Sequence, residues 1–186
     1  MKRHHIGLLA AVLLAPGHAV AADWRADPTK SSIRFSGVQV GAPIAGRFER
    51  FEATIAFDPA KPETGRAAVL IDRTSARTGD VQRDEALPRK DWFDVKANAQ
   101  ARFEATRFVE KGSGNYEAVG TLTIRGMTRN VTLPFRLDLD GAQARAKGHL
   151  NLIRTDFGVG QGAWASGQWV ALEVGVDVDL AASRMP

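Results

Sequence analysis

Histidine and cysteine set the first limit on the chemistry of this chain. The 186 residues contain no cysteine and four histidines, three of which lie in the first 21 residues. The fourth, His149, alternates with Lys147 and Asn151 on the polar face of a predicted strand. Nucleophilic hydrolysis needs a base beside a serine or cysteine, and zinc or copper sites need several imidazole or thiolate ligands. We therefore predict no catalytic histidine and no bound metal.

Carboxylates are the remaining groups that could act as acids or bases. Asp84, Asp91 and Asp156 are the candidates, and they leave a carboxylate-dependent hydrolase or isomerase open as an alternative function. Aspartates at positions 138 and 140, and at 177 and 179, lie two residues apart. Such pairs could bind calcium, but the polar face of a solvated strand shows the same spacing.

A glycine-rich run lies near the C-terminal end. Gly158, Gly160 and Gly162 precede Trp164 and Trp169. A dinucleotide-binding loop would be followed by a helix, whereas this run leads into a predicted strand. The pattern favours a wide loop at the rim of the fold, with the two tryptophans as core residues or ligand contacts.

Residues 1–21 have the pattern of a secretory signal peptide. Lys2 and Arg3 precede an apolar run of about ten residues and then the small residues Ala19, Val20 and Ala21. A membrane-spanning helix needs about twenty apolar residues. We predict cleavage before Ala22 or Asp23, one mature domain over residues 22–186, and a periplasmic location. The formal net charge of the chain is only +4, which gives no indication of a nucleic-acid partner.

Alternation of apolar and polar residues predicts that most of the chain after residue 32 forms β-strands, and these strands must position the candidate residues described above. It is clearest over residues 130–139 and 170–180, where one face is apolar and the other polar. Pro134, inside the first of these, indicates an edge, a bulge or a locally unpaired position. Eight strands are predicted, over residues 33–35, 48–57, 67–71, 101–105, 116–124, 130–139, 142–152 and 170–180.

Residues 73–98 form the one long connection between predicted strands. Asp80 is a candidate N-cap for a short helix, which Pro88 would end. A further turn would place Trp92 and Phe93 against the body of the protein. Because long loops in compact domains often cover a site, we expect this helical insertion, between strands 3 and 4, to do so.

An antiparallel sheet of eight strands can close into a barrel, which removes its exposed edges. Such a barrel is just wide enough for side chains or one small ligand. Five residues of the predicted strand 142–152 are expected to point inward, and all but the last are small, so they leave space. They are Ala142, Ala144, Ala146, Gly148 and Leu150. Phenylalanines from other strands could fill that space, so a filled core with a partner-binding surface stays open as a third function.

Four segments, in order and spacing, resemble the YceI-like family of polyisoprenoid-binding, lipocalin-like proteins. They are Phe-Glu-Arg-Phe at 48–51 with Ile-Ala-Phe-Asp at 55–58, Arg-Asp-Glu-Ala-Leu at 83–87 with Asp-Trp-Phe-Asp at 91–94, Gly-Thr-Leu-Thr-Ile-Arg-Gly-Met-Thr at 120–128, and Ile-Arg-Thr-Asp-Phe-Gly at 153–158. The resemblance implies an all-β, eight-stranded antiparallel lipocalin-like barrel around an apolar tunnel.

The function implied is that of a periplasmic carrier that holds an isoprenoid, quinone-like or fatty chain without catalysis or cofactor. The expected lining is Phe35, Phe48, Phe57, Phe103, Leu122, Val131, Phe135, Leu150, Trp164, Trp169 and Val174. Arg125, Arg154 and Asp156 are expected to contact a head group or to anchor loops. The segment 158–164 resembles a subgroup associated with membrane cytochrome b-type proteins, which are candidate partners. The sequence leaves the oligomeric state open, a dimer included.

Overall fold

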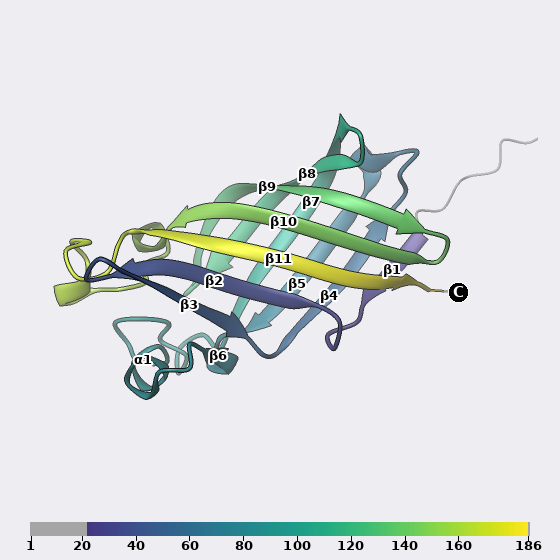
Figure 1. Ribbon diagram of the computed structural model, residues 1–186. Helices are drawn as coiled ribbons and strands as arrows, with labels where there is room; N and C mark the ends of the chain where they lie inside the picture. Colours follow the sequence, from purple (N-terminus) through teal and green to yellow (C-terminus); the bar gives the residue numbers. More distant parts are fainter. Residues whose placement is uncertain (1–21, 186) are drawn as a thin grey trace, which may run out of the picture.

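The computed structural model describes residues 22–185, most of which lie in β-strands (Figure 1). The predicted signal peptide, residues 1–21, lies outside the described residues. The strands are β1 (Ala22–Ala26), β2 (Ser32–Gln39), β3 (Ala42–Phe48), β4 (Phe51–Phe57), β5 (Arg66–Asp72), β6 (Ala76–Arg77), β7 (Gln100–Gly112), β8 (Asn115–Ile124), β9 (Met127–Asp140), β10 (Gln143–Ile153) and β11 (Glu173–Arg184).

These strands close into an antiparallel barrel. Neighbours run in the order β1, β4, β5, β7, β8, β9, β10 and β11, and β11 pairs back with β1. Further along the same edge, residues 175–179 of β11 pair with β2, which continues through β3 to β6. The pairs β1 with β2, β3 with β4 and β5 with β6 are therefore interrupted halves of three long strands. This arrangement confirms the predicted eight-stranded barrel.

The predicted strand bounds differ from the observed ones at strand ends and at the interruptions. The predicted strands 101–105 and 170–180 are observed as β7 and β11, over Gln100–Gly112 and Glu173–Arg184. Residues 48–57 were predicted as one strand, but the strand breaks at Glu49 and Arg50. The backbone N–H of Glu49 donates to the carbonyl of Ser75, at 3.2 Å, and that of Arg50 donates to the Ser75 hydroxyl, at 3.0 Å. These bonds lead away from the sheet ladder, so the chain bends there. The alternation did not reveal β1, which is only five residues long.

The helical insertion lies between β6 and β7, as predicted. Helix α1 (Val81–Ala86) begins after Asp80, whose carboxylate accepts a hydrogen bond from the backbone N–H of Arg83 at 3.0 Å. It ends two residues before Pro88. Trp92 and Phe93 pack against a buried cluster formed by Leu122, Phe157 and Val159. No helix among residues 22–185 has the length and apolarity required to cross a bilayer.

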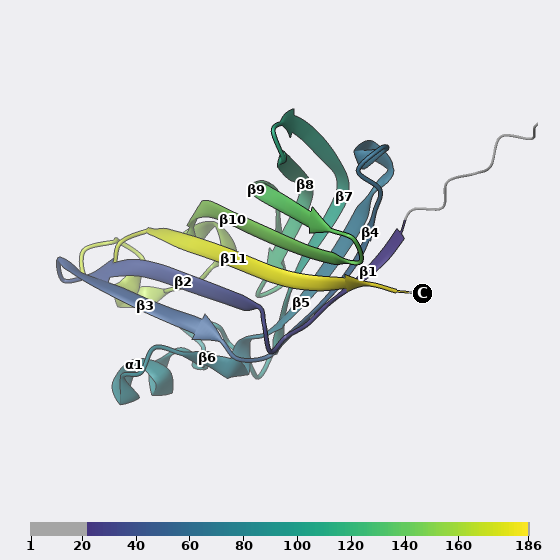
Figure 2. The same ribbon diagram turned by 45° about the vertical axis from the view of Figure 1, so that its right-hand side comes forward.

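The two ends of the barrel differ. Figure 2 shows α1 and the loop after β10 at one end and the chain terminus at the other. At the terminal end, hereafter the closed end, Phe57 packs edge-on against Phe108 and Tyr116, with ring centroids 5.1 and 5.5 Å apart. Trp24 joins this buried cluster. At the opposite end, hereafter the loop end, residues 78–99 and 154–172 run outside the strands.

Pro134 marks a gap in the ladder between β9 and β10. The two strands pair from the 140–143 turn only as far as Phe135 and Gly148. Pro134 pairs with Glu117 of β8 on its other side, so β9 stays in the barrel. The predicted unpaired position is confirmed, because beyond it β9 and β10 separate toward the loop end.

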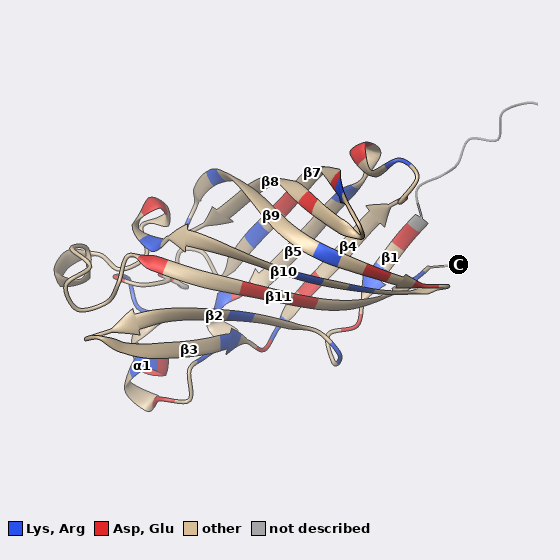
Figure 3. Ribbon diagram, turned by 45° about the horizontal axis from the view of Figure 1, so that its top comes forward, with Lys and Arg blue, Asp and Glu red and all other residues tan. Residues whose placement is uncertain are grey.

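Charged side chains lie on the outer faces of the strands. Figure 3 shows charges of both signs recurring along β10 and β11. Arg145 of β10 donates from Nε and Nη2 to both carboxylate oxygens of Asp179 of β11, each at 2.8 Å. Inward positions of the same strands are apolar, so one set of strands provides a hydrated outside and an apolar inside.

Candidate functional site

An apolar cavity of about 530 Å³ occupies the barrel. Its wall includes Trp24 and Phe57 at the closed end, and Leu87 and Trp92 at the loop end. The cavity therefore follows the barrel axis rather than one side of it. Most of the wall residues are only partly buried, because their side chains border this space instead of packing against one another.

The structure places ten of the eleven predicted lining residues in the cavity wall. They are Phe35, Phe48, Phe57, Phe103, Leu122, Val131, Phe135, Leu150, Trp164 and Val174. The exception is Trp169, which is not in the wall and whose side chain is 48% exposed. Its carbonyl accepts a hydrogen bond from Val40 at the tip of the β2–β3 hairpin, which holds it outside the barrel mouth. Contact of the other ten with a ligand stays a prediction.

Small residues of β10 leave room for the cavity. Ala144, Ala146 and Gly148 are in its wall, and Ala146 lies between Leu137 of β9 and Leu180 of β11. Ala142, predicted to point inward with them, is instead exposed in the turn before β10. A turn residue follows hairpin geometry, so strand alternation does not apply to it.

Aromatic rings narrow the loop end of the cavity. Phe48 lies between Phe35 and Phe93, with ring centroids 5.3 and 6.0 Å away. Trp92 and Trp164, from the two long loops, have centroids 5.5 Å apart. These rings belong to the cavity wall, so the loops provide the last apolar contacts before solvent.

Arg154 anchors the loop that follows β10. The side chain is 4% exposed, and its guanidinium donates to the backbone carbonyls of Val159, Gly160, Trp164, Val170 and Ala171. Burial lowers the pKa of Arg154. Because these carbonyls engage its Nε and both Nη atoms, the geometry provides the loop-anchoring contacts expected of this residue and gives it no exposed donor edge.

Arg125 and Asp156 were grouped with Arg154 in the sequence-based prediction. Arg125 donates from Nη1 to the carbonyls of Lys90 and Trp92, and so holds the other long loop. Asp156 is exposed, and its side chain forms no hydrogen bond or ion pair with any residue that the structure describes. The structure therefore brings Arg125 and Arg154 to the same end of the barrel and leaves Asp156 outside.

Arg73 is a cavity residue that the sequence reasoning missed. It follows β5 directly, is 1% exposed and belongs to the cavity wall. Nη1 donates to the carbonyl of Phe93 at 2.6 Å, and the guanidinium carbon lies 5.9 Å from the centroid of the Phe93 ring. The sequence does place an arginine directly after an apolar strand face. An arginine at the end of a strand is usually exposed, so this signal did not indicate a cavity residue.

The carboxylates considered for acid–base chemistry are not gathered at the cavity. Burial would raise the pKa of Asp84, but hydrogen bonds from the hydroxyl and backbone N–H of Thr78, both at 2.7 Å, outweigh it and lower the pKa. Asp91 is exposed. Within the described part of the chain, no three His, Cys, Asp or Glu side chains are grouped closely enough to hold a metal ion.

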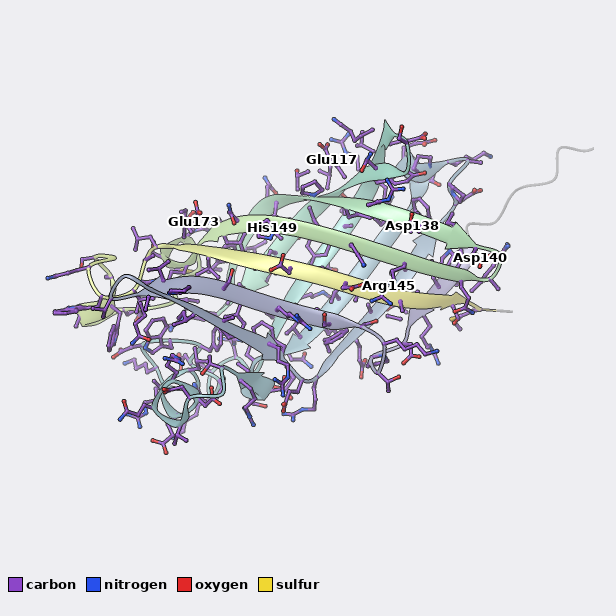
Figure 4. The ribbon with its side chains drawn as sticks, viewed as in Figure 1. Glu117, Asp138, Asp140, Arg145, His149 and Glu173 are labelled. Carbon is purple, nitrogen blue, oxygen red and sulfur yellow. The ribbon has the colours of Figure 1, made fainter. Side chains whose placement is uncertain are left out.

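His149 lies on the outer face of β10, next to β11 (Figure 4). Nδ1 is 2.7 Å from a carboxylate oxygen of Asp177, and Nε2 is 3.0 Å from the side-chain oxygen of Asn151. These two hydrogen bonds raise the pKa of His149. The barrel wall separates this group from the cavity.

This geometry defines a class of protein: a closed eight-stranded β-barrel that encloses an elongated apolar cavity. The sequence profile of the YceI-like domain matches residues 24–182. The chain belongs to the YceI-like family, as the four sequence segments predicted.

Comparison with individual proteins supports the same fold and family. A UPF0312 protein from Serratia proteamaculans is 32% identical over 189 residues, which cover 95% of this chain and 97% of the relative. The crystal structure of BcnA from Burkholderia cenocepacia superposes with a TM-score of 0.82 at 35% identity, over 85% of this chain and 99% of BcnA. A polyisoprenoid binding domain from Saccharophagus degradans shares the fold, with a TM-score of 0.71 at 16% identity, over 89% of this chain and 99% of the domain.

Proposed function

We propose that this protein binds and carries, or sequesters, a lipid with a long isoprenoid, quinone-like or fatty chain in the periplasm. The observation that carries the proposal is the apolar cavity, which extends from the Trp24 and Phe57 cluster to the loop end of the barrel. A cavity of this shape accepts a chain lengthwise. The polar outer face of the strands keeps the complex compatible with water.

Apolar burial alone provides enough free energy for such binding. Each CH₂ group removed from water contributes about 0.8 kcal/mol, so the roughly twenty carbons of four prenyl units contribute about 16 kcal/mol before losses. Association costs about 4–15 kcal/mol in translational and rotational freedom. A chain of a few prenyl units is therefore long enough to bind without a charged anchor, whereas a short chain is not.

The family supports the chemical class of the ligand. The Saccharophagus degradans relative is described as a polyisoprenoid binding domain, and its barrel covers most of this chain. A periplasmic location is supported by the signal-peptide pattern of residues 1–21. A membrane cytochrome b-type protein is the proposed partner, on the resemblance of residues 158–164.

Organic extraction of the purified protein tests this function. The protein is expressed with its own residues 1–21, extracted, and analysed by mass spectrometry. The proposal predicts a prenyl or acyl lipid in near-stoichiometric amount in the periplasmic fraction. The absence of any such lipid from protein made in several hosts would contradict it.

A further inference from the structure

Arg73 has an unusual hydrogen-bonding state for a buried cation. Nη1 donates to Phe93, but the buried Nε and Nη2 have no hydrogen-bond partner among residues 22–185. A buried donor without a partner destabilises the folded protein, and a buried charge without a counterion does so more strongly. Arg154, at the same end of the cavity, shows the opposite state, with carbonyl partners for Nε and both Nη atoms.

The surroundings of Arg73 leave its charge largely uncompensated. Burial lowers its pKa to about 10, and repulsion from Arg125 acts in the same direction. Asp94 attracts the guanidinium, but the two side chains form no ion pair. At neutral pH, Arg73 is therefore still a cation. It forms no ion pair among residues 22–185, and Asp80 of the cavity wall pairs instead with Arg83, at 3.7 Å.

The two free nitrogens lie on the edge of the guanidinium that binds carboxylates. On the outside of this barrel, Arg145 uses the same atoms, Nε and Nη2, to hold both oxygens of Asp179 at 2.8 Å each. This paired geometry is the strongest that arginine forms with a planar anion. An elongated apolar cavity whose wall carries such an edge is complementary to an acid with a long chain.

We propose that the cavity binds an amphiphile with a carboxylate head group, and that Nε and Nη2 of Arg73 hold the two carboxylate oxygens at the loop end. The inference rests on the proposed function, since the chain of the ligand must occupy the barrel. The ring of Phe93 lies over the guanidinium. Both nitrogens are buried, so the head group reaches them when the loop that carries Phe93 shifts.

The test compares two probes that differ only at the head group. Protein freed of lipid is titrated by calorimetry with geranylgeranoic acid and with its methyl ester at neutral pH. Because a charge-assisted pair is lost in the ester, the acid is expected to bind at least about tenfold more tightly. In Arg73→Met this preference is expected to fall to near one. In Arg102→Met, which alters an exposed outer arginine, the preference is expected to remain.

Each outcome has a definite meaning. Equal affinities for acid and ester in the unaltered protein overturn the role of Arg73 and leave the proposed function standing. A preference that persists in Arg73→Met shows that another group holds the carboxylate and also overturns it. If Arg73→Met does not fold, Arg73→Lys keeps the charge but removes the two-nitrogen edge, and it must still reduce the preference. Failure of both probes to bind contradicts the proposed function itself.

Discussion

Replacing Ala146 by phenylalanine should obstruct the cavity while leaving the barrel intact. Ala146 lies in the cavity wall between Leu137 and Leu180. The added ring has six carbons and would displace about one five-carbon prenyl unit of the ligand. At about 0.8 kcal/mol per CH₂, this loss amounts to about 4 kcal/mol, or roughly a thousandfold in Kd. Because the chain can bend around the ring, we expect an increase in Kd of at least about tenfold.

Calorimetric titration with geranylgeraniol measures this change. The matched control is Lys147→Phe, which adds a ring one residue along β10 on its exposed outer face. Circular dichroism and thermal unfolding establish that both variants are folded. The reasoning would be refuted by a folded Ala146→Phe protein that binds geranylgeraniol as tightly as Lys147→Phe does.

Three further predictions concern stability. Arg154→Met should lower the free energy of unfolding by about 3 kcal/mol, because several buried carbonyls lose their donor. Urea denaturation measures this loss, and a change below about 1 kcal/mol would contradict the anchoring role. The raised pKa of His149 means that its pair with Asp177 contributes fully below the unfolded pKa of about 6.5 and is lost as pH rises through the higher folded pKa. Because the pair is exposed, this loss should stay below about 1 kcal/mol and should be absent from His149→Gln in the same pH series. Gly120→Ala should lower the free energy of unfolding by at least about 3 kcal/mol or prevent folding, since the added Cβ would lie 1.9 Å from the carbonyl oxygen of Glu104. A melting temperature equal to that of the unaltered protein would disprove this prediction.

The barrel could be predicted from the sequence because its inside and outside differ in polarity. Alternation over β9 and β11 predicts which side chains face the cavity. Pro134 marks the position where the hydrogen-bond ladder between β9 and β10 ends. Alternation carries no signal for a break in a strand. The bend at Glu49 depends on hydrogen bonds to Ser75, 26 residues further along the chain, and such bonds leave no local pattern.

The candidate site was predictable along the strands and much less so in the loops. Phe103 and Leu150 face the cavity because period-two geometry requires it. Trp169 lies in a loop whose course depends on the carbonyl bonds of Arg154, so its outward position could not be read from spacing. Arg73 was missed for a related reason: its burial results from the packing of Phe93 over it, and this contact belongs to the fold of the insertion.

A crystal structure of the protein with geranylgeraniol tests the central claim most directly. The account predicts continuous density for the chain inside the barrel, between the Trp24 and Phe57 cluster and the rings of Trp92 and Trp164. Density for the lipid only on the outer surface, with the cavity filled by rearranged side chains, would contradict it.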